Sequence, residues 1–332
     1  MATKLKFGLL LPHFCEFASI ESCIEGAKKA EAYGFDSVWV RDHLVFEPHG
    51  MEGEDNSHIE GLLVLAAISS VCKKLTLGTG TMISHRHPIH LAQAMAGLST
   101  MCDSNIIMGL GLGTFPHEFE AAGHTKTTLQ DRANIAKVNA QLCRRFWAGE
   151  KISYKDEYYD FKDVELKPTP SKKIPIWYGG GTPASARRAA DYCDGWMPGR
   201  IPTATFNKMV KYLEEQCKLA GHPMVTTGAI PITSIDKNRD VALSKVNVKG
   251  LINEGNAPSK KTWVKPKSGT FSTVEDIEGL LMAGTPADIA RDTKRYEEAG
   301  LNHIVFDLRF RYADWYQQID LLGQEVLPAV RA

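Results

Sequence analysis

The chain has 332 residues, of which 43% are apolar, and its 39 basic side chains balance 39 acidic ones. This length suits a single α/β barrel with insertions, and the apolar share is enough for a large core. A neutral chain offers no basic surface for nucleic acid and no polybasic patch for a membrane, so we expect neither as a partner.

The first apolar run and the cysteines bear on the cellular compartment. The run at the start of the chain soon meets Pro12, His13 and Glu16, so it is too short for a secretory signal. No apolar run approaches the roughly 20 residues of a membrane span. The seven cysteines are scattered and form no C-x-x-C pair, which argues against a disulfide framework or a zinc knuckle. We therefore expect a reducing cytoplasm.

Eight short apolar segments read as β-strands, and helical patterns fall between most of them. The expected strands span residues 6–11, 37–40, 75–79, 105–109, 176–179, 195–198, 226–232 and 303–306. The expected helices span residues 20–32, 59–71, 90–101, 129–148, 183–192, 203–220, 286–299 and 315–330, and Ser19 caps the first. Parallel strands need crossover helices, so this alternation predicts a (β/α)8 TIM barrel, with residues 1–332 as one domain. An open, doubly wound α/β sheet is the alternative.

Two segments interrupt the repeat. Residues 151–167 alternate polar and aromatic side chains, which predicts a β-hairpin. Residues 253–273 form a long polar stretch rich in glycine, proline and lysine. Insertions of this kind in a compact domain are usually lids or mobile loops, so we expect one of the two here.

Active sites of such barrels lie at the carboxyl ends of the strands, which selects the motifs to consider. The second strand ends in Arg41-Asp42-His43, where a carboxylate beside an imidazole can orient a ligand and exchange protons near neutral pH. An ordinary turn would explain the same residues. The fourth strand runs into "GLGLGTFPHEFE", in which Gly111 and Gly113 allow a flat ring to approach the backbone. Glu118 follows as a candidate acid.

Three consecutive glycines, Gly179, Gly180 and Gly181, separate the fifth strand from a helix that begins near Thr182. They leave main-chain N–H groups unshielded, and the helix adds its own unpaired donors and the positive end of its dipole. A tight turn would usually need one glycine only. The pattern therefore predicts a phosphate-binding corner.

Two histidines after the third strand, His85 and His87, resemble a metal-binding pair, and Asp307 follows the last strand. Metal-dependent barrel hydrolases place such a pair after the first strand, where this chain has only His13. Pro88 is better explained as the start of the next helix. We expect no metal, and a metal-dependent TIM-barrel hydrolase that uses His85 and His87 stays an alternative function.

Five segments together resemble the luciferase-like monooxygenase family, which comprises flavin- and deazaflavin-dependent TIM-barrel oxidoreductases. The segments are "GFDSVWVRDHL", "LTLGTGTMISHRHPIHLAQAMAGLS", "GLGLGTFPHEFEAAG", "FKDVELKPTPSKKIPIWYGGGTPASARRAADYCDGWMP" and "GTPADIARDTKRYEEAGLNHIVF". They occur in order and span nearly the whole chain. The chain departs from the family at "LSTMCDSN" and at Thr114-Phe115, so the resemblance does not give the substrate.

The resemblance implies where a planar redox cofactor would bind. His43 and Glu118 are the implied catalytic residues. Residues 78–81 match a segment that often holds a non-proline cis peptide behind the ring, and residues 179–182 match the phosphate segment. The implied cofactor-binding residues are Asp42, His43, Gly78, Thr79, Gly80, Thr81, Gly111, Gly113, Gly179, Gly180, Gly181 and Thr182.

The implied function is an oxidoreductase that acts on a small organic substrate with reduced coenzyme F420 or reduced FMN. Reduced F420 would transfer hydride, whereas reduced FMN would activate O2 and would need a separate reductase. The "RDHL" sequence after the second strand slightly favours F420. In either case His43 would donate or shuttle a proton near the ring or the substrate.

Four lysines of the insertion, Lys260, Lys261, Lys265 and Lys267, could meet the acidic tail of F420, although a solvated loop explains them equally well. We expect a homodimer, because most soluble oligomers are symmetric dimers. A non-catalytic flavin-binding dimer is a further alternative, since a fold alone does not give a function.

Overall fold

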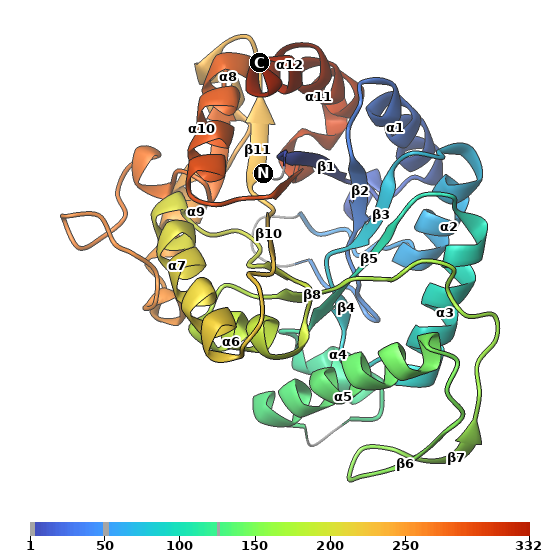
Figure 1. The fold of residues 1–332 in the computed structure, drawn as a ribbon. Helices are drawn as coiled ribbons and strands as arrows, with labels where there is room; N and C mark the ends of the chain where they lie inside the picture. The colour runs from blue at the N-terminus through green and yellow to red at the C-terminus, as the bar shows by residue number, and fades with distance from the viewer. Residues whose placement is uncertain (1–3, 49–52, 125–126) are drawn as a thin grey trace.

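A computed structural model describes residues 4–48, 53–124 and 127–332, and its centre is a closed parallel barrel (Figure 1). Neighbouring strands pair in the order β3-β2-β1-β13-β10-β9-β8-β5, and β5 pairs back with β3. The predicted TIM barrel is confirmed, and the open sheet is wrong because this last pairing closes the ring. The barrel strands are β1 (Lys6–Leu10), β2 (Ser37–Val40), β3 (Thr76–Thr79), β5 (Ile106–Gly111), β8 (Ile176–Gly179), β9 (Gly195–Met197), β10 (Thr226–Ala229) and β13 (His303–Phe306).

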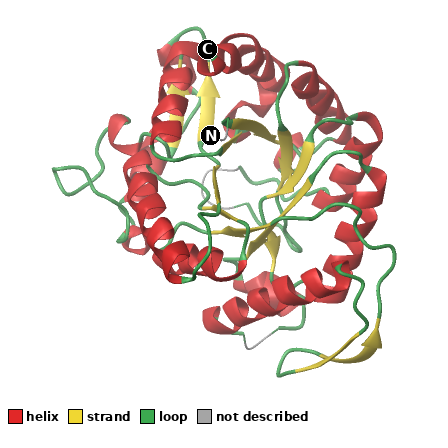
Figure 2. Ribbon diagram, in the orientation of Figure 1, coloured by secondary structure: helices red, strands yellow, loops and turns green. Residues whose placement is uncertain are grey.

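Helices surround the barrel and cover its outer surface (Figure 2). The Ser19 side chain accepts a hydrogen bond from Ser22 N at 3.1 Å and caps the first helix, as expected. Pro88 begins the third. The principal helices are α1 (Ile20–Ala32), α2 (Gly61–Val71), α3 (Pro88–Met101), α5 (Leu129–Trp147), α6 (Pro183–Tyr192), α7 (Thr203–Leu219) and α10 (Pro286–Glu298). Short helices α4 (Pro116–Ala121), α8 (Arg239–Ser244) and α9 (Val248–Gly255) lie in the connections.

The predicted strand over residues 226–232 is wrong in its second half. It breaks after β10, at Pro231, which has no N–H to continue a ladder. The chain resumes as β11 (Ile232–Ile235), which pairs in parallel with an unpredicted strand, β12 (Leu281–Gly284). The predicted last helix also divides, into α11 (Trp315–Leu321), a π-helical turn (Leu322–Val326) and α12 (Leu327–Arg331).

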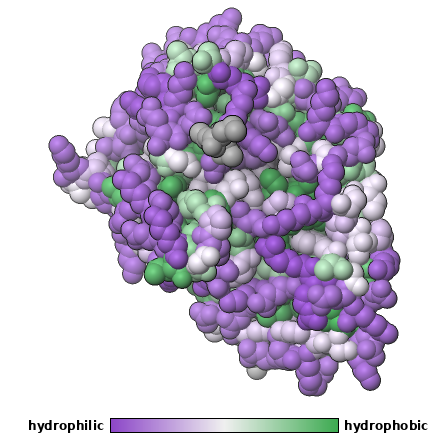
Figure 3. All heavy atoms as spheres, in the orientation of Figure 1, coloured by the Kyte–Doolittle hydropathy of each residue, from purple (hydrophilic) through white to green (hydrophobic). Residues whose placement is uncertain are grey.

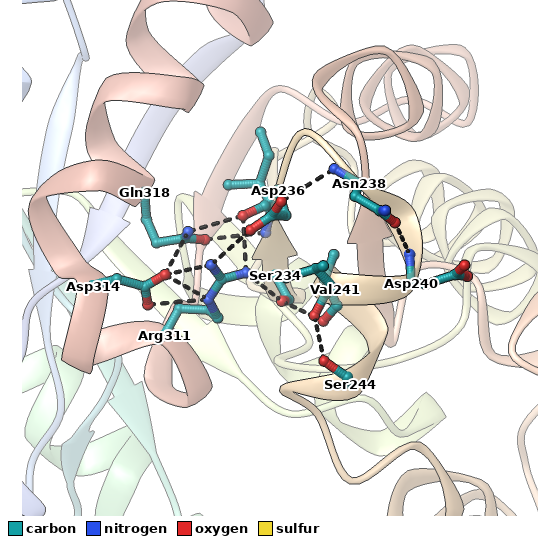
Figure 4. Close-up of polar contacts among 11 residues, drawn as sticks. Ser234, Asp236, Asn238, Asp240, Val241, Ser244, Arg311, Asp314 and Gln318 are labelled. Atoms are coloured by element: carbon teal, nitrogen blue, oxygen red, sulfur yellow. Dashed lines mark hydrogen bonds and ion pairs between the residues drawn. The ribbon is translucent and has the colours of Figure 1, made fainter.

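A buried arginine holds the small β11–β12 sheet against the end of the chain (Figure 4). Arg311, in a 3-10 helix (Arg309–Asp314), is 2% exposed, and its Nε lies 3.0 Å from both Asp314 carboxylate oxygens. Its Nη1 donates to Ser234 Oγ at 3.1 Å and to Ile235 O at 2.9 Å. The guanidinium therefore pairs a charge and satisfies the edge of β11 at once.

Two tryptophans fill the barrel interior, and glycines on neighbouring strands make room for them. A Cβ at Gly78 would lie 2.3 Å from the Trp39 ring, and a Cβ at Gly195 would lie 2.5 Å from the Trp177 ring. Both rings contact His303 edge-on, at centroid distances of 5.5 and 5.6 Å. Glycine at these positions is thus a packing requirement of the core.

The two insertions have different structures. Strands β6 (Ile152–Lys155) and β7 (Asp160–Val164) pair antiparallel and project beyond α5 (Figure 1). Residues 253–273 include the end of α9 and a 3-10 turn (Pro258–Lys260). Trp263 and Phe271 are 6% and 3% exposed. Asn256 Nδ2 donates a hydrogen bond to Phe271 O, and Asn256 Oδ1 accepts one from Phe271 N. This segment therefore packs on the barrel through its own apolar side chains.

The surface on the side shown in Figure 3 is mostly polar, with small apolar areas between the hydrophilic side chains. Among the described residues, no helix is both long and apolar enough to cross a membrane.

Candidate active site

A cavity of about 730 Å³ opens at the carboxyl ends of the barrel strands. Its walls come from the segments after β2, β3, β5, β8 and β9 and from the insertion after α9. Of the residues predicted for the site, Asp42, His43, Gly80, Thr81, Gly111, Gly113, Glu118, Gly179, Gly180, Gly181 and Thr182 line it. Gly78 and Thr79 do not: Gly78 lies against Trp39, and Thr79 is fully buried, with Oγ1 accepting from Gly109 N at 2.9 Å.

The two candidate catalytic residues are in contact. His43 Nδ1 lies 3.2 Å from Glu118 Oε1, and His43 Nε2 lies 3.1 Å from Arg41 Nη2. Arginine can only donate, so Nε2 accepts, and the hydrogen of the neutral imidazole is on Nδ1, where it donates to Glu118. The two partners thus fix one tautomer of His43 and direct its one ring lone pair, on Nε2, at Arg41.

Glu118 is fully buried, and its carboxylate is ionised. Its Oε1 also accepts from the Leu44 and Val45 amides, at 2.8 and 3.4 Å. Burial alone would raise the pKa of Glu118, but the bonds from His43 and the two amides hold that pKa below its usual range. Its Oε2 is buried without a hydrogen-bond partner among the described residues. A donor on a bound ligand would satisfy this oxygen.

Asp42 has a different role from its neighbour. Its Oδ2 accepts from Ile83 N at 2.8 Å and from Arg86 Nε at 2.9 Å, and its Oδ1 accepts from Arg86 Nη2 at 2.6 Å. Arg86 also contacts Glu60 at 2.7 Å. This bidentate pair ties the segment after β2 to the segment after β4 (Met82–Ile83), so the carboxylate holds the wall of the cavity in place.

The triple-glycine corner is sterically closed to other residues. A Cβ at Gly179 would lie 2.7 Å from Thr81 Cγ2, and a Cβ at Gly181 would lie 2.8 Å from Ile201 Cγ2. Gly180 has φ +115°, and a Cβ there would lie 2.6 Å from Ser185 Oγ. Thr182 Oγ1 accepts from Ser185 N at 3.2 Å and caps α6. Gly180 N donates to Met197 O at 3.1 Å, so the backbone that the corner offers to a ligand lies at Gly181 and at the start of α6, an arrangement that binds phosphate groups.

The remaining glycines of the site are needed by the protein itself. A Cβ at Gly111 would lie 2.2 Å from Thr81 Oγ1, and one at Gly113 would lie 2.7 Å from Ile83 Cγ2. The peptide bond between Gly80 and Thr81 is cis, within the segment where the family resemblance placed one. The glycines after β5 therefore pack against the segment after β3, whether or not a ring lies over them.

The sequence did not identify Arg200, Arg188 and Glu254 as lining residues of the cavity, which they are. The one signal for Arg200 was its position just after a barrel strand. Of the four insertion lysines, Lys260 lines the cavity and pairs with Glu254 at 3.1 Å. Lys265 donates to Gly255 O at 2.6 Å, and Lys261 and Lys267 are exposed.

The two histidines of the metal alternative lie in separate surroundings. The His85 ring packs edge-on against Phe119, and its Nε2 is buried without a partner. His87 caps α3, with Nδ1 accepting from Ile89 N at 3.3 Å, and its ring lies against Tyr159. In the described parts of the chain, no three His, Cys, Asp or Glu side chains are grouped so that they could hold a metal ion. The structure thus gives the hydrolase alternative no support.

Comparison with known proteins gives relatives of the chain as a whole. The family model for luciferase-like monooxygenases matches residues 6–303. The F420-dependent glucose-6-phosphate dehydrogenase of Amycolatopsis mediterranei is 25% identical over 332 aligned residues, which cover 93% of this chain and 94% of the relative.

Two solved structures share the fold. An F420-dependent secondary alcohol dehydrogenase, in complex with an F420–acetone adduct, superposes with a TM-score of 0.81 at 21% identity and covers 99% of this chain and 100% of its own. The oxygenating constituent of 3,6-diketocamphane monooxygenase of Pseudomonas putida, in complex with FMN, superposes with a TM-score of 0.78 at 17% identity and covers 98% of both chains.

Proposed function

The chain belongs to the luciferase-like monooxygenase family, and we propose that it is an F420-dependent dehydrogenase that acts on a hydroxyl-bearing carbon of a small organic substrate. The observation that carries this proposal is the buried Arg41–His43–Glu118 contact at the cavity mouth. Removal of hydride from an alcohol carbon requires an acceptor for the hydroxyl proton, and this contact supplies one.

The residues present fit the cofactor. The glycine corner, Thr182 and the nearby Arg188 would hold its phosphate, because bare amides, a helix start and a cation all favour an anion. Glu118 Oε2 is an unused acceptor in the same cavity. Bound F420 supplies the carbon that takes up or gives up hydride. The segment 253–273 is proposed as a lid, since Lys260, Thr262 and Trp263 line the cavity.

The side chains of the protein then manage the proton. When the substrate hydroxyl replaces Arg41 Nη2 at the Nε2 lone pair, His43 takes the hydroxyl proton as the hydride leaves the carbon. The imidazolium formed is stabilised by the Glu118 carboxylate that already accepts from Nδ1. Arg41, whose Nη2 lies at Nε2, donates to the substrate oxygen as it becomes a carbonyl. In the reverse direction the same groups return the proton.

The second candidate is an FMN-dependent monooxygenase, which is favoured by the FMN-bound structure of the same fold. That route would require a separate reductase to supply reduced FMN. We favour F420 because a relative that matches 93% of this chain is an F420-dependent dehydrogenase, and because His43 supplies the proton acceptor that alcohol oxidation needs.

Binding and turnover test the proposal separately. The purified protein is titrated with F420 and with FMN in both redox states, followed by cofactor fluorescence, and is then assayed for F420 reduction with a panel of alcohols and lactols. We expect tight binding of F420 and turnover that falls about 10²–10⁴-fold in His43→Asn without a change in F420 affinity. Tight binding of FMN alone would contradict the F420 assignment. Binding without turnover of any alcohol would favour a non-catalytic carrier.

We also propose a homodimer that forms through α2 and α3, in a reducing cytoplasm. Leu63, Val71 and Met101 on these neighbouring helices are 67%, 41% and 50% exposed. α2 is apolar on all sides, and such a helix is usually covered. Leu63→Glu should turn a dimer into a monomer in light scattering, while Leu219→Glu, on the exposed face of α7, should not.

A further inference from the structure

Arg200 lines the cavity with a charge that the protein does not neutralise. The residue follows β9, and its side chain is partly buried. Within residues 4–48, 53–124 and 127–332, this guanidinium forms no hydrogen bond and no ion pair. A partly buried arginine normally has a carboxylate or several carbonyl groups as partners, because an unpaired charge away from bulk water is costly.

The charged groups around Arg200 add to the excess of positive charge. Burial first, and then the neighbouring Arg309 and Arg41, lower the pKa of Arg200 to about 10, so it stays protonated at neutral pH. Asp307 and Glu254 oppose this effect. Both carboxylates already have partners.

The partners of these two carboxylates are close. Arg309 Nε lies 2.9 Å from each Asp307 oxygen, and Arg309 Nη2 lies 2.6 Å from Oδ2. Glu254 is paired with Lys260 at 3.1 Å. Neither carboxylate is therefore left to neutralise Arg200.

Arg200 follows a segment that packs on the phosphate corner, because a Cβ at Gly181 would lie 3.3 Å from Pro198 O and 2.8 Å from Ile201 Cγ2. The groups that act on Arg200 follow β2 and β13 or belong to α9, whereas the glycine corner follows β8 and has Arg188 beside it. Arg41 contacts His43, so the cluster reaches the proton acceptor. The charged groups around Arg200 thus extend toward His43, which favours a group of the substrate over one of the cofactor as its partner.

We propose that Arg200, supported by Arg41 and Arg309, binds an anionic group of the substrate, so that the substrate is a hydroxy compound with a phosphate or carboxylate. This inference rests on the proposed dehydrogenase function, and it deepens that function by a substrate class. It follows from a cation in the cavity that lacks a counter-ion, and an oxyanion is the ligand chemistry that an arginine fork pairs with best.

Inorganic phosphate is the first probe. The F420-loaded protein, whose phosphate corner is occupied by the cofactor, is titrated with phosphate by calorimetry. We expect measurable binding that weakens about ten- to one-hundredfold in Arg200→Gln, in line with the loss of one charged hydrogen bond. Arg200→Lys should recover part of the affinity. Lys208→Gln, on the exposed face of α7, should behave as the wild type.

Failure of the inference and failure of the proposed function look different. If F420 does not bind, the proposed function is wrong, whatever phosphate does. If F420 binds but phosphate does not, or binds equally well to Arg200→Gln, the anion site is wrong and the dehydrogenase proposal stands. Affinity for F420 is measured for every variant. If Arg200→Gln lowers F420 affinity as much as a substitution in the glycine corner does, Arg200 belongs to the cofactor site and the inference is overturned.

A matched set of lactols identifies the anion. Glucose, glucuronate and glucose 6-phosphate share the reacting hydroxyl and differ in a neutral, carboxylate or phosphate group at the far carbon. The anion that Arg200 binds should give the largest kcat/KM, and Arg200→Gln should lower that value about ten- to one-hundredfold while changing the value for glucose less than threefold. Equal losses for all three sugars would contradict a role in anion recognition.

Discussion

The glycine corner offers the sharpest test of how the backbone serves the site, through the substitution Gly180→Ala. Gly180 has φ +115°, a conformation that L side chains rarely adopt, so alanine costs about 1–3 kcal/mol from the backbone alone. The added Cβ would also lie 2.6 Å from Ser185 Oγ.

The second contribution comes from the helix cap. Ser185 Oγ lies 2.9 Å from Thr182 Oγ1, which also accepts from Ser185 N. Displacement of Ser185 disturbs this cap, and loss of a cap costs about 1 kcal/mol. We therefore expect the free energy of unfolding to fall by about 2–4 kcal/mol in total. The amides of the corner move with the cap, so F420 affinity should fall about ten- to one-hundredfold.

Gly221→Ala is the matched control. Gly221 has φ +77° and follows α7, and a Cβ there would meet nothing within 4 Å. It should lose about 1–2 kcal/mol of stability through backbone strain and keep the F420 affinity of the wild type. Urea unfolding gives the stabilities and fluorescence titration gives the affinities. If Gly180→Ala keeps the F420 affinity of the wild type and loses no more stability than the control, the glycine corner does not bind the cofactor phosphate.

Three further changes probe other parts of the molecule. Glu118→Gln keeps an acceptor for His43 Nδ1 but removes the charge that stabilises the imidazolium, so kcat should fall roughly 10–100-fold and its pH profile should shift; an unchanged profile would contradict the pairing. Burial lowers the pKa of both His13 and His303 from 6.5 to about 3. Between these two pH values the two histidines are protonated in the unfolded chain but neutral in the folded protein. The free energy of unfolding should therefore fall by about 2 kcal/mol per histidine between about pH 6.5 and about pH 5, and by less in His303→Asn. Equal urea midpoints at these two pH values would refute this. Arg311→Met removes the cation that pairs with Asp314, while the Ile235 carbonyl keeps its hydrogen bond from Gln318 Nε2 at 2.8 Å. Thermal unfolding should therefore show a loss of about 3 kcal/mol, partly restored by Asp314→Leu in the same chain, whereas no restoration would place the loss in packing.

The barrel could be predicted because its signals are local. A helix, a tight stop and a short apolar strand recur along the chain, and caps such as Ser19 and Pro88 fix where helices begin. The expected helix starts therefore fall within two residues of the observed ones at α2 and α3. The β11–β12 pair was missed because its two strands are short and its pairing joins segments far apart in the sequence, which no local pattern records.

The candidate site could be predicted in part, for the same reason. His43 and Glu118 both follow barrel strands, so the fold alone brings them to one mouth, although their contact at 3.2 Å depends on side-chain directions that the sequence does not give. Asp42 looked like a ligand-binding group from its place beside His43. Only the structure reveals that Arg86, 44 residues later, occupies its carboxylate.

The charges of the cavity explain why Arg200 stands apart from the other cations. Asp42 and Glu60 are matched by Arg86, Asp307 by Arg309, and Glu254 by Lys260. Arg86 joins the segments that hold Asp42 and Glu60, whereas the Asp307–Arg309 and Glu254–Lys260 pairs each lie within one segment. In every case the charge of the cation is engaged by a carboxylate. Arg200 fastens nothing, so its interaction with an anion costs no structural contact. The corner at β8 gathers its positive potential from amides and a helix start, whereas Arg200 contributes a side-chain charge. Because Ile201, the residue after Arg200, lies against Gly181, the two anion sites are neighbours, and only F420 affinity measured in the Arg200 variants separates their roles.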